Sequence, residues 1–323
     1  MRRREFIAGF GAAAAWPLVA HAQQVPRIPR VVYLSPVGIP AQINSYRAQM
    51  HELGYVEGRN IRLEFRDAAG EVDRLPAIAE AVVAAGDVDV IMAISTPAAL
   101  AAHKATETIP IVAFAAVDPV GSGLADSLAH PGRNVTGIAV FSEETTVKRV
   151  ELMRDVAPRA IRLATVTTKA SSGAQSVGPL LDAGLKLGFT VENLVIDDPA
   201  DLAQVLSPKA FAAIDALVFI PDVVLSAHID EIVKLVGASG KPAIFPSADW
   251  VRSGGLMSFG PDYADASRHL TAQLSRILKG AKPGDLPFER PTKFDLRINL
   301  RTARAMGIEL SPMVLARADE VIE

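Results

Sequence analysis

VDVIMAISTPAALAAHKATETIPIVAFA, residues 88–115, is the stretch that decides the fold. The apolar run Val88–Ile94 is bounded by turn residues and predicts a buried strand. The segment Pro97–Thr106 predicts a helix, and Ile109–Ala115 predicts the next strand. Because strands joined by helices of this length form βαβ crossovers, the stretch predicts a parallel sheet covered by helices.

The same alternation continues on both sides of this stretch. Ile61–Phe65 alternates apolar with polar residues, which is typical of a half-buried edge strand. We expect the other strands of this first round at Arg30–Ser35 and Val135–Phe141, and its other helices at Gln42–Leu53 and Val72–Ala85.

A second round of strands and helices starts near Phe141. Its expected strands are 162–167, 190–196, 216–220 and 242–245, and its expected helices are 145–156, 176–187, 199–206 and 224–237. Two consecutive series of alternating strands and helices predict an α/β protein of two Rossmann-like lobes, each with its own parallel sheet. The rest of the chain adds strands at 256–259 and 292–298, a long helix at 263–279 and terminal helices.

We expect the last segment to return to the first lobe and then to cross once more to the second. The predicted domains are therefore a signal segment (1–22), an N-terminal lobe (23–141 with 246–285) and a C-terminal lobe (142–245 with 286–323). Several crossings between two lobes make a hinge, and a hinged cleft can close on a ligand.

Composition excludes several classes of protein. The 33 basic and 36 acidic residues leave a formal net charge of −3, which argues against a nucleic-acid-binding protein with a basic face. The absence of cysteine excludes disulfides, thiolate metal sites and a cysteine nucleophile.

The N-terminus, MRRREFIAGFGAAAAWPLVAHAQ (residues 1–23), is typical of an export signal. Arginines precede an apolar run, and Ala20-His21-Ala22 is an A-x-A cleavage signal. Arg3-Arg4-Glu5-Phe6-Ile7 resembles the twin-arginine motif. We therefore expect a periplasmic protein that is cleaved after Ala22. No later stretch reaches the roughly 18 apolar residues of a membrane helix, so the product is not expected to be membrane-embedded.

The sequence contains partial matches to catalytic and cofactor-binding motifs, and each lacks a required residue. Gly121–Asp126 begins like a dinucleotide-binding loop but ends in Asp126. Gly237–Lys241 is similar to part of a P-loop, but Pro242 stands where Ser or Thr is needed. His51-Glu52 lacks the second histidine of a zinc-protease helix. We expect no catalytic residue, no metal and no cofactor.

Polar residues stand where predicted strands end and helices begin. Ligands of open α/β sheets collect at the carboxyl ends of the strands, where backbone N–H groups and helix dipoles converge. Placement at the same edge of two facing sheets predicts a ligand-binding cleft. The candidates of this kind are Ser35, Ser95, Thr96, Ala116, Asp118, Thr168, Asp222, Ser247 and Asp249.

An ordered series of short motifs extends over essentially the whole chain. These are Glu52-Leu-Gly-Tyr-Val-Glu-Gly-Arg-Asn60, Asp73-Arg-Leu-Pro76, Thr96-Pro-Ala-Ala-Leu-Ala-Ala102, Ile109-Pro-Ile-Val112, Asp118-Pro119, His130-Pro-Gly-Arg-Asn-Val-Thr-Gly137, Asn299-Leu-Arg-Thr-Ala303, Met306-Gly307 and Leu315-Ala-Arg-Ala-Asp-Glu-Val-Ile322. With them the chain resembles the ABC-transporter substrate-binding proteins of the tryptophan/phenylalanine-receptor type. That family often has glycines before the Thr-Pro helix, where this chain has Ala93-Ile94-Ser95.

The resemblance implies a type I periplasmic-binding-protein fold and capture of a small, amino-acid-like solute. The implied partners are an ABC permease and its ATPase, and we expect a monomer. The ligand carboxylate would then lie at Ser95 and Thr96, where helix N–H groups point outward, with Ser35 and Thr168 assisting. Asp222 is the first candidate for the ammonium group and Asp118 the second, while Phe141 could cover an apolar side chain.

Two other classes of function stay open from the sequence. One is an exported α/β enzyme that uses Asp118, Asp222 or Asp249 as a base. The other is a ligand sensor that docks on a membrane receptor.

Overall fold

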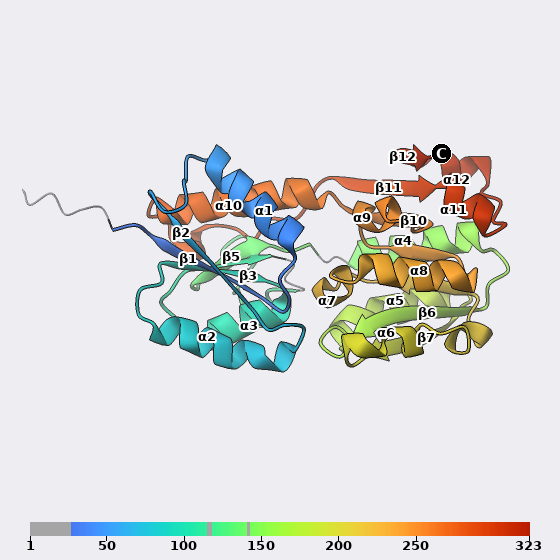
Figure 1. The fold of residues 1–323 in the computed structure, drawn as a ribbon, viewed down its shortest axis with the longest axis horizontal. Coiled ribbons are helices and arrows are strands. Elements are labelled where there is room, and N and C mark those ends of the chain that lie inside the picture. The colour runs from blue at the N-terminus through green and yellow to red at the C-terminus, as the bar shows by residue number, and fades with distance from the viewer. Residues whose placement is uncertain (1–26, 115–117, 141–142) are drawn as a thin grey trace, which may run out of the picture.

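The strands form two separate sheets, one in each of two lobes that lie side by side along the long axis (Figure 1). The computed structural model describes residues 27–114, 118–140 and 143–323. The N-terminal lobe contains a wholly parallel sheet of five strands in the order β2-β1-β3-β4-β5. These are β1 (Arg30–Ser35), β2 (Arg62–Asp67), β3 (Val90–Ile94), β4 (Ile111–Phe114) and β5 (Val135–Ile138).

Helices cover both faces of this sheet. Alternate residues of β1 point to opposite faces, as the pleat of a strand requires. Val31 and Tyr33 join the core under α1 and α10, whereas Val32 and Leu34 join the core under α2 and α3. The bounds are α1 (Pro40–Glu52), α2 (Leu75–Ala84), α3 (Thr96–Ala105) and α10 (Tyr263–Leu278), with a short 3-10 helix η1 (Val72–Arg74).

The C-terminal lobe contains a seven-stranded sheet in the order β12-β11-β10-β9-β8-β6-β7. Its neighbouring strands are parallel except for β10 and β11, which are antiparallel. They are β6 (Arg162–Thr168), β7 (Thr190–Ile196), β8 (Ala216–Phe219), β9 (Ala243–Phe245), β10 (Met257–Pro261), β11 (Phe294–Asn299) and β12 (Glu320–Ile322).

Two apolar clusters fill the C-terminal lobe, one on each face of its sheet. The first lies under α4 (Glu143–Val156) and α5 (Ala174–Lys186). The second is built around Phe219, Phe245 and Trp250, whose rings stack at centroid distances of 4.8 and 4.9 Å. The remaining elements are η2 (Pro199–Asp201), α6 (Leu202–Val205), η3 (Ala210–Ala213), α7 (Val223–Ser226), α8 (Ile229–Ser239), α9 (Ala248–Arg252), η4 (Pro283–Asp285), α11 (Leu300–Ala305) and α12 (Pro312–Leu315).

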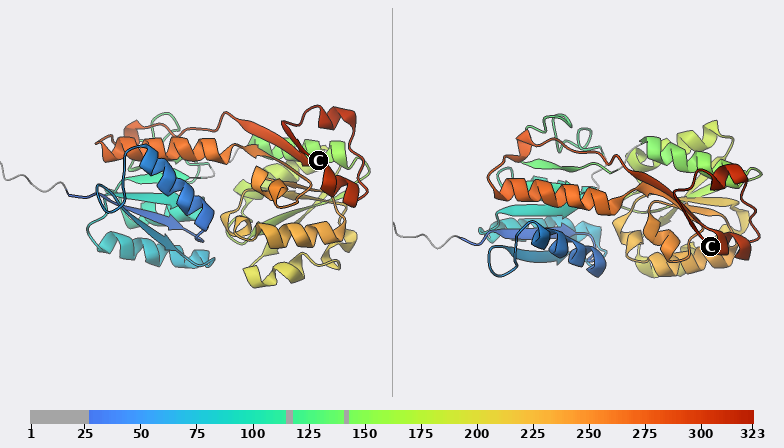
Figure 2. Two further views of the ribbon diagram at one scale, coloured as in Figure 1. Left: turned by 45° about the horizontal axis from the view of Figure 1, so that its top comes forward. Right: turned by 90° about the horizontal axis from the view of Figure 1, so that it is seen from above.

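The chain passes between the lobes three times: after β5, between β10 and α10, and before β11 (Figure 2). The expected return to the N-terminal lobe at residue 246 is wrong, because β10 pairs with β9 in the seven-stranded sheet. The return therefore comes at Asp262. The next passage is also later than residue 285, because Glu289 still bridges Ile138 of the N-terminal lobe. A strand's sequence shows that it is buried but does not show which sheet it joins.

The predicted α/β fold with two lobes is confirmed. Two local predictions differ from the structure. The helix expected at 224–237 is two helices, α7 and α8, and the final strand β12 was not predicted. None of the helices in the described ranges is both long and apolar enough to span a membrane.

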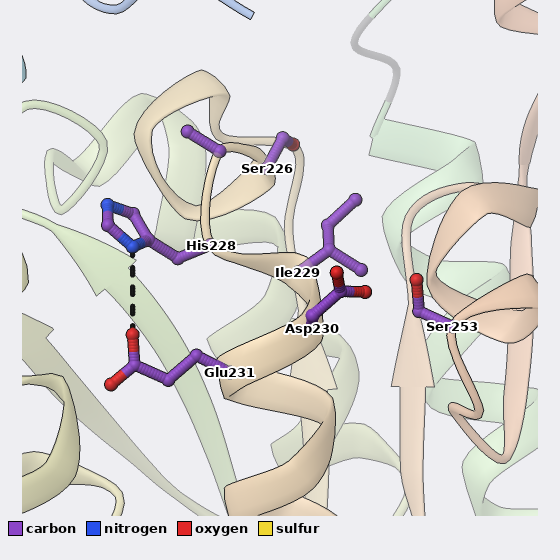
Figure 3. A pocket seen from close by; sticks show the side chains of 7 residues that line it. Ser226, His228, Ile229, Asp230, Glu231 and Ser253 are labelled. Atoms are coloured by element: carbon purple, nitrogen blue, oxygen red, sulfur yellow. Dashed lines mark ion pairs between the residues drawn. The ribbon is translucent and has the colours of Figure 1, made fainter. Parts of the chain in front are cut away.

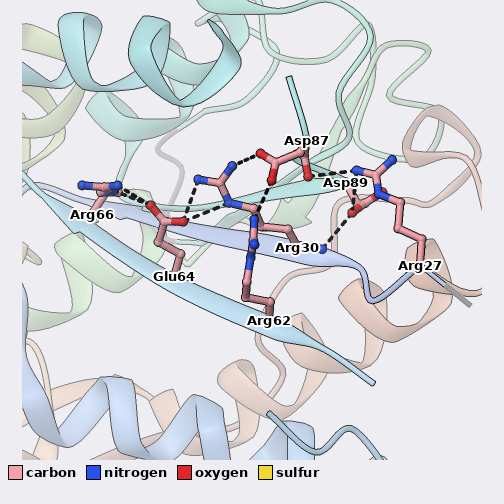
Figure 4. A network of polar contacts seen from close by, with 7 residues as sticks. All are labelled: Arg27, Arg30, Arg62, Glu64, Arg66, Asp87 and Asp89. Atoms are coloured by element: carbon pink, nitrogen blue, oxygen red, sulfur yellow. Dashed lines mark hydrogen bonds and ion pairs between the residues drawn. The ribbon is translucent and has the colours of Figure 1, made fainter. Parts of the chain in front are cut away.

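A network of charged side chains fixes the beginning of β1 at the outer end of the N-terminal lobe (Figure 4). The Arg30 guanidinium is only 10% exposed and donates from Nη2 to Glu64 Oε2 at 2.6 Å, while it also pairs with Asp87. Arg66 Nε donates to the other oxygen of Glu64 at 2.5 Å, and Arg62 Nη2 donates to Asp87 at 2.6 Å. The network therefore joins β1, β2 and the turn before β3.

Partial burial alone would raise the pKa of Glu64, but hydrogen bonds from Arg30 and Arg66 hold it below its usual range. A depressed carboxyl pKa stabilises the folded state above the unfolded-state pKa, and this contribution is lost as the pH falls through the folded-state value.

Glu64→Gln should lower the free energy of unfolding by about 1–2 kcal/mol at pH 7, because Arg30 loses a charged partner. The difference from the wild type should shrink as the pH falls below about 4, the usual carboxyl pKa, and disappear only below the lower pKa of Glu64 in the folded state. Urea unfolding at several pH values measures both effects. Glu57→Gln is the control, since Glu57 is half exposed and pairs with Arg47 alone at 3.2 Å; an equal effect of the two substitutions would contradict the network's role.

Candidate functional site

The carboxyl ends of the parallel strands in the two lobes face each other across the gap between the lobes (Figure 1). We call these two rows of strand ends the facing edges. Most of the predicted ligand-binding residues that the structure describes lie on them or in the loops that follow them. Ala116 and Phe141 lie outside the described residues, as does the predicted signal segment.

Ser35 and Ser95 follow β1 and β3 on the N-terminal edge, and both hydroxyls already have local partners. Ser35 is fully buried and its Oγ donates to the carbonyl of Val37 at 2.8 Å. Ser95 is the N-cap of α3, and its Oγ accepts from the backbone N–H of Ala98 at 3.2 Å. Thr96 is the first residue of this ten-residue helix, whose N-terminus faces the other lobe.

Backbone strain is concentrated at the N-terminal edge. The described residues include three non-glycine residues with positive φ, namely Ala69, Ser95 and Asp118, and each follows a strand of this sheet. Ser95 has φ of +128°, a conformation that normally requires glycine. Strain of this kind costs about 1–3 kcal/mol and is concentrated in proteins at binding and switch regions.

Asp118 is turned into its own loop. Its Oδ1 accepts from the N–H of Gly121 at 3.0 Å, and its backbone carbonyl accepts from Ser122. The side chain therefore stabilises the turn after β4 while remaining on an exposed residue.

On the C-terminal edge, Asp222, Thr168 and Ser171 form one hydrogen-bonded group. Asp222 Oδ2 accepts from the hydroxyls of Thr168 and Ser171, each at 2.6 Å. Its Oδ1 accepts from the N–H groups of Val224 and Leu225 at 2.8 and 3.0 Å, which caps α7. A carboxylate offers about four acceptor positions, so all of them are occupied. The assignment of Asp222 to a ligand ammonium group does not fit this geometry.

Ser247 and Asp249 lie at the end of β9. Ser247 is the N-cap residue of α9 and makes no side-chain capping bond. Asp249 is exposed and pairs with Arg252 at 2.6 Å. The structure thus brings Ser247 and Asp249 together, and Thr168 and Asp222 together, on one edge.

Sequence reasoning missed two groups beside the passages between the lobes. Tyr263 is the first residue of α10, and its ring lies edge-on to Phe114 at a centroid distance of 6.1 Å. Arg149 lies in the middle of α4, is 1% exposed, and donates from Nε to the carbonyl of Phe259 at 2.7 Å. The sequence could have indicated that Arg149 is buried, because it lies on the same face of the helix as Thr146, Val150 and Met153, which are buried.

An open surface hollow lies elsewhere, beside α7 and α8 (Figure 3). It is open, measures about 400 Å³ and is lined by Ser226, Ala227, His228, Ile229, Asp230, Glu231 and Ser253. His228 pairs with Glu231 at 3.7 Å at one side of it. Over the residues with described coordinates, no cluster of His, Cys, Asp and Glu side chains could hold a metal ion.

Comparison with known proteins places this geometry in a family. The family model described as ABC transporter substrate binding protein matches residues 31–322. A tyrosine-binding protein from Clostridioides difficile is 29% identical over 262 residues, which cover 80% of this chain and 74% of the relative.

Two solved structures share the fold over 91% of this chain and 99% of their own. An ABC domain from Streptococcus pneumoniae in complex with L-Trp is 25% identical, with a TM-score of 0.81. A ligand-free, open substrate-binding protein with adhesive properties from Clostridium difficile is 26% identical, with a TM-score of 0.61. Given the match from residue 31 to residue 322, the chain belongs to the family of ABC transporter substrate-binding proteins, which bind a small solute and work with a membrane permease.

Proposed function

We propose that this protein binds an amino-acid-like solute between the facing edges, in the periplasm, and delivers it to an ABC permease driven by its ATPase. The observation that carries the proposal is the arrangement of the two lobes. At nearly equal sequence identity and equal coverage, the chain superposes better on the L-Trp complex (TM-score 0.81) than on the ligand-free, open structure (0.61). The arrangement is therefore close to that of a ligand-bound relative.

Contacts between the rims of the two lobes support a closed arrangement. Lys169 of the C-terminal lobe lies 4.0 Å from Asp73 of the N-terminal lobe, and both side chains are mostly exposed. In the neighbouring loops, a Cβ atom at Gly70 would lie 3.7 Å from Cγ of Pro199. These loops follow β2, β6 and β7, so the two facing edges approach each other closely on this side of the molecule.

The chemistry of the facing edges suits a polar ligand that is held rather than transformed. The N-terminus of α3 presents backbone N–H groups and the positive end of a helix dipole, which favour a carboxylate. Ser95, Thr96, Ser247 and Asp249 remain the proposed contacts from the sequence, with Asp249 now the acidic group for an ammonium. Each of the three candidate bases of an exported enzyme already has a local partner, since Asp118 and Asp222 hold their own loops in place and Asp249 pairs with Arg252.

L-Tyrosine or L-tryptophan should raise the melting temperature of the purified protein. A ligand that binds only the folded state stabilises it by RT ln(1 + [L]/Kd), which is about 2.7 kcal/mol at a hundredfold excess over Kd and corresponds to several degrees. A thermal-shift panel of amino acids, with a neutral sugar as the control, measures this. If no amino acid shifts the transition, the ligand is of another class, and native mass spectrometry of the freshly purified protein would identify it.

Lys169→Glu should weaken binding of that ligand about two- to fivefold, because it places two negative charges at the rim of the closed form. The effect is small because an exposed ion pair contributes about 0.2–1 kcal/mol. Lys186→Glu, an exposed change at the end of α5 in the same lobe, should have no effect. Isothermal titration gives the affinities; equal affinities for the two variants would count against closure at this rim.

Export through the twin-arginine route should depend on Arg3 and Arg4. Replacing both with Lys should leave an uncleaved precursor in the cytoplasm, whereas Arg2→Lys should leave export intact. Immunoblots of periplasmic and cytoplasmic fractions distinguish the two forms by size. A mature periplasmic product from the double variant would show that the protein leaves by another route.

A further inference from the structure

Arg149 is a buried cation whose charge has no acidic partner among the described residues. Its guanidinium is 1% exposed, and no carboxylate oxygen of the described residues comes within 4.0 Å of it. The described residues give it one hydrogen bond, from Nε to the carbonyl of Phe259. A charge taken out of water without a counter-charge is strongly destabilising, so its presence at this position needs a reason.

A second, half-buried arginine on the same helix shows what a structural role looks like. Arg154 donates to the carbonyls of Pro158, Ala160 and Leu187 and lies over the ring of Phe189, at 3.6 Å from its centroid. Its guanidinium therefore ties the end of α4 to two loops, far from the facing edges. Arg149 has no comparable set of partners.

The position of Arg149 directs its charge toward the facing edges. Because α4 leads into β6, it runs antiparallel to the strands, and its N-terminus lies at the C-terminal edge. Helical side chains tilt toward the helix N-terminus. The guanidinium accordingly lies next to Gly260, where a Cβ would be 3.5 Å from Nη2 and 1.9 Å from the carbonyl oxygen of Pro246. Pro246 and Gly260 are at the carboxyl ends of β9 and β10.

Tyr263 connects this charge to the N-terminus of α3. Burial raises the pKa of the Tyr263 hydroxyl to about 12, while the charge of Arg149 lowers it and that of Asp249 raises it. The Tyr263 ring packs on Phe114, and the carbonyl of Phe114 accepts from the N–H of Ser95 at 3.0 Å. Tyr263 therefore follows closely after the segment Phe259–Gly260, which contacts Arg149, while its ring contacts the strand that leads to the N-terminus of α3.

We infer that Arg149 and Tyr263 form an anion subsite beside the passages between the lobes, in which the Tyr263 hydroxyl donates to the ligand carboxylate and the Arg149 guanidinium supplies the neutralising charge. The N–H groups of α3 then bind the same carboxylate from the opposite lobe. This inference rests on the proposed function, because it assumes a solute held between the facing edges. It assigns the ligand class as a small carboxylate, with Asp249 beside the subsite for a positive group.

The test compares L-tyrosine with L-tyrosinamide, and L-tryptophan with its amide, because the amide replaces the negative carboxylate with a neutral group of nearly the same size and shape. The wild type should bind the acid at least tenfold more tightly than the amide. Arg149→Gln should lower the affinity for the acid about 10- to 100-fold and change that for the amide less than threefold, since one charge-assisted interaction is lost. Tyr263→Phe, which keeps the ring on Phe114, should act in the same direction. Arg154→Gln is the matched control and should keep the preference for the acid.

Separate outcomes distinguish this inference from the proposed function. If amino acids bind but Arg149→Gln and Tyr263→Phe keep the acid preference, or weaken acid and amide equally, the subsite is overturned and the proposed function stands. If no amino acid binds, benzoate at constant ionic strength is the probe. A benzoate-induced rise in the melting temperature that disappears in both variants would support the subsite without the amino-acid ligand, and its absence in the wild type would overturn the subsite. Because Tyr263→Phe removes a single oxygen, it decides the question even if Arg149→Gln does not fold.

Discussion

Parallel pairing of strands is the constraint on which the rest of this structure depends. Each parallel pair needs a crossover helix, and repeated crossovers of one hand bring all carboxyl ends of a sheet to the same edge. Two such sheets, joined by three passages of the chain, turn those edges toward each other. A binding region made only of loops and helix N-termini follows from this topology, with no catalytic group required. That is the architecture of a protein that holds a solute for an ABC transporter.

The acidic side chains at the facing edges are used mainly to hold the edges themselves. Asp222 caps α7 and accepts from two hydroxyls, and Asp118 closes the turn after β4. Such carboxylates keep the loops in fixed conformations, so a ligand bound there as proposed would lose little binding energy in ordering them. Ser95 also fixes this edge, despite its strained backbone. Its hydroxyl caps the N-terminus of α3, and a glycine, which would relieve the strain, would leave that helix uncapped.

The sequence predicted the two-lobed fold because apolar periodicity reports local structure and burial. It could not predict that β10 joins the second sheet, because strand pairing is set by partners far along the chain. It placed Ser95, Thr168 and Asp222 correctly at strand ends, yet it could not show that the Asp222 carboxylate is fully occupied by neighbours from β6 and α7. Arg149 and Tyr263 were missed for the same reason. Arg149 is a single charge on an apolar helix face, and Tyr263 is the first residue of a helix. Only the fold shows that both lie beside the passages between the lobes.

The place of α10 in the fold has a consequence for the order in which the protein matures. This helix comes from residues 263–278, yet its Ala266, Leu270 and Leu274 complete the core of the N-terminal lobe against β1, β3 and β4. During synthesis, the N-terminal lobe leaves the ribosome first. It therefore lacks a helix on one face of its sheet until most of the second lobe has also emerged. Domains generally fold as units from the N-terminus onward. In this chain the apolar face of the lobe that is made first stays uncovered until β10 of the second lobe has been made, and β11 and β12 then complete the second lobe.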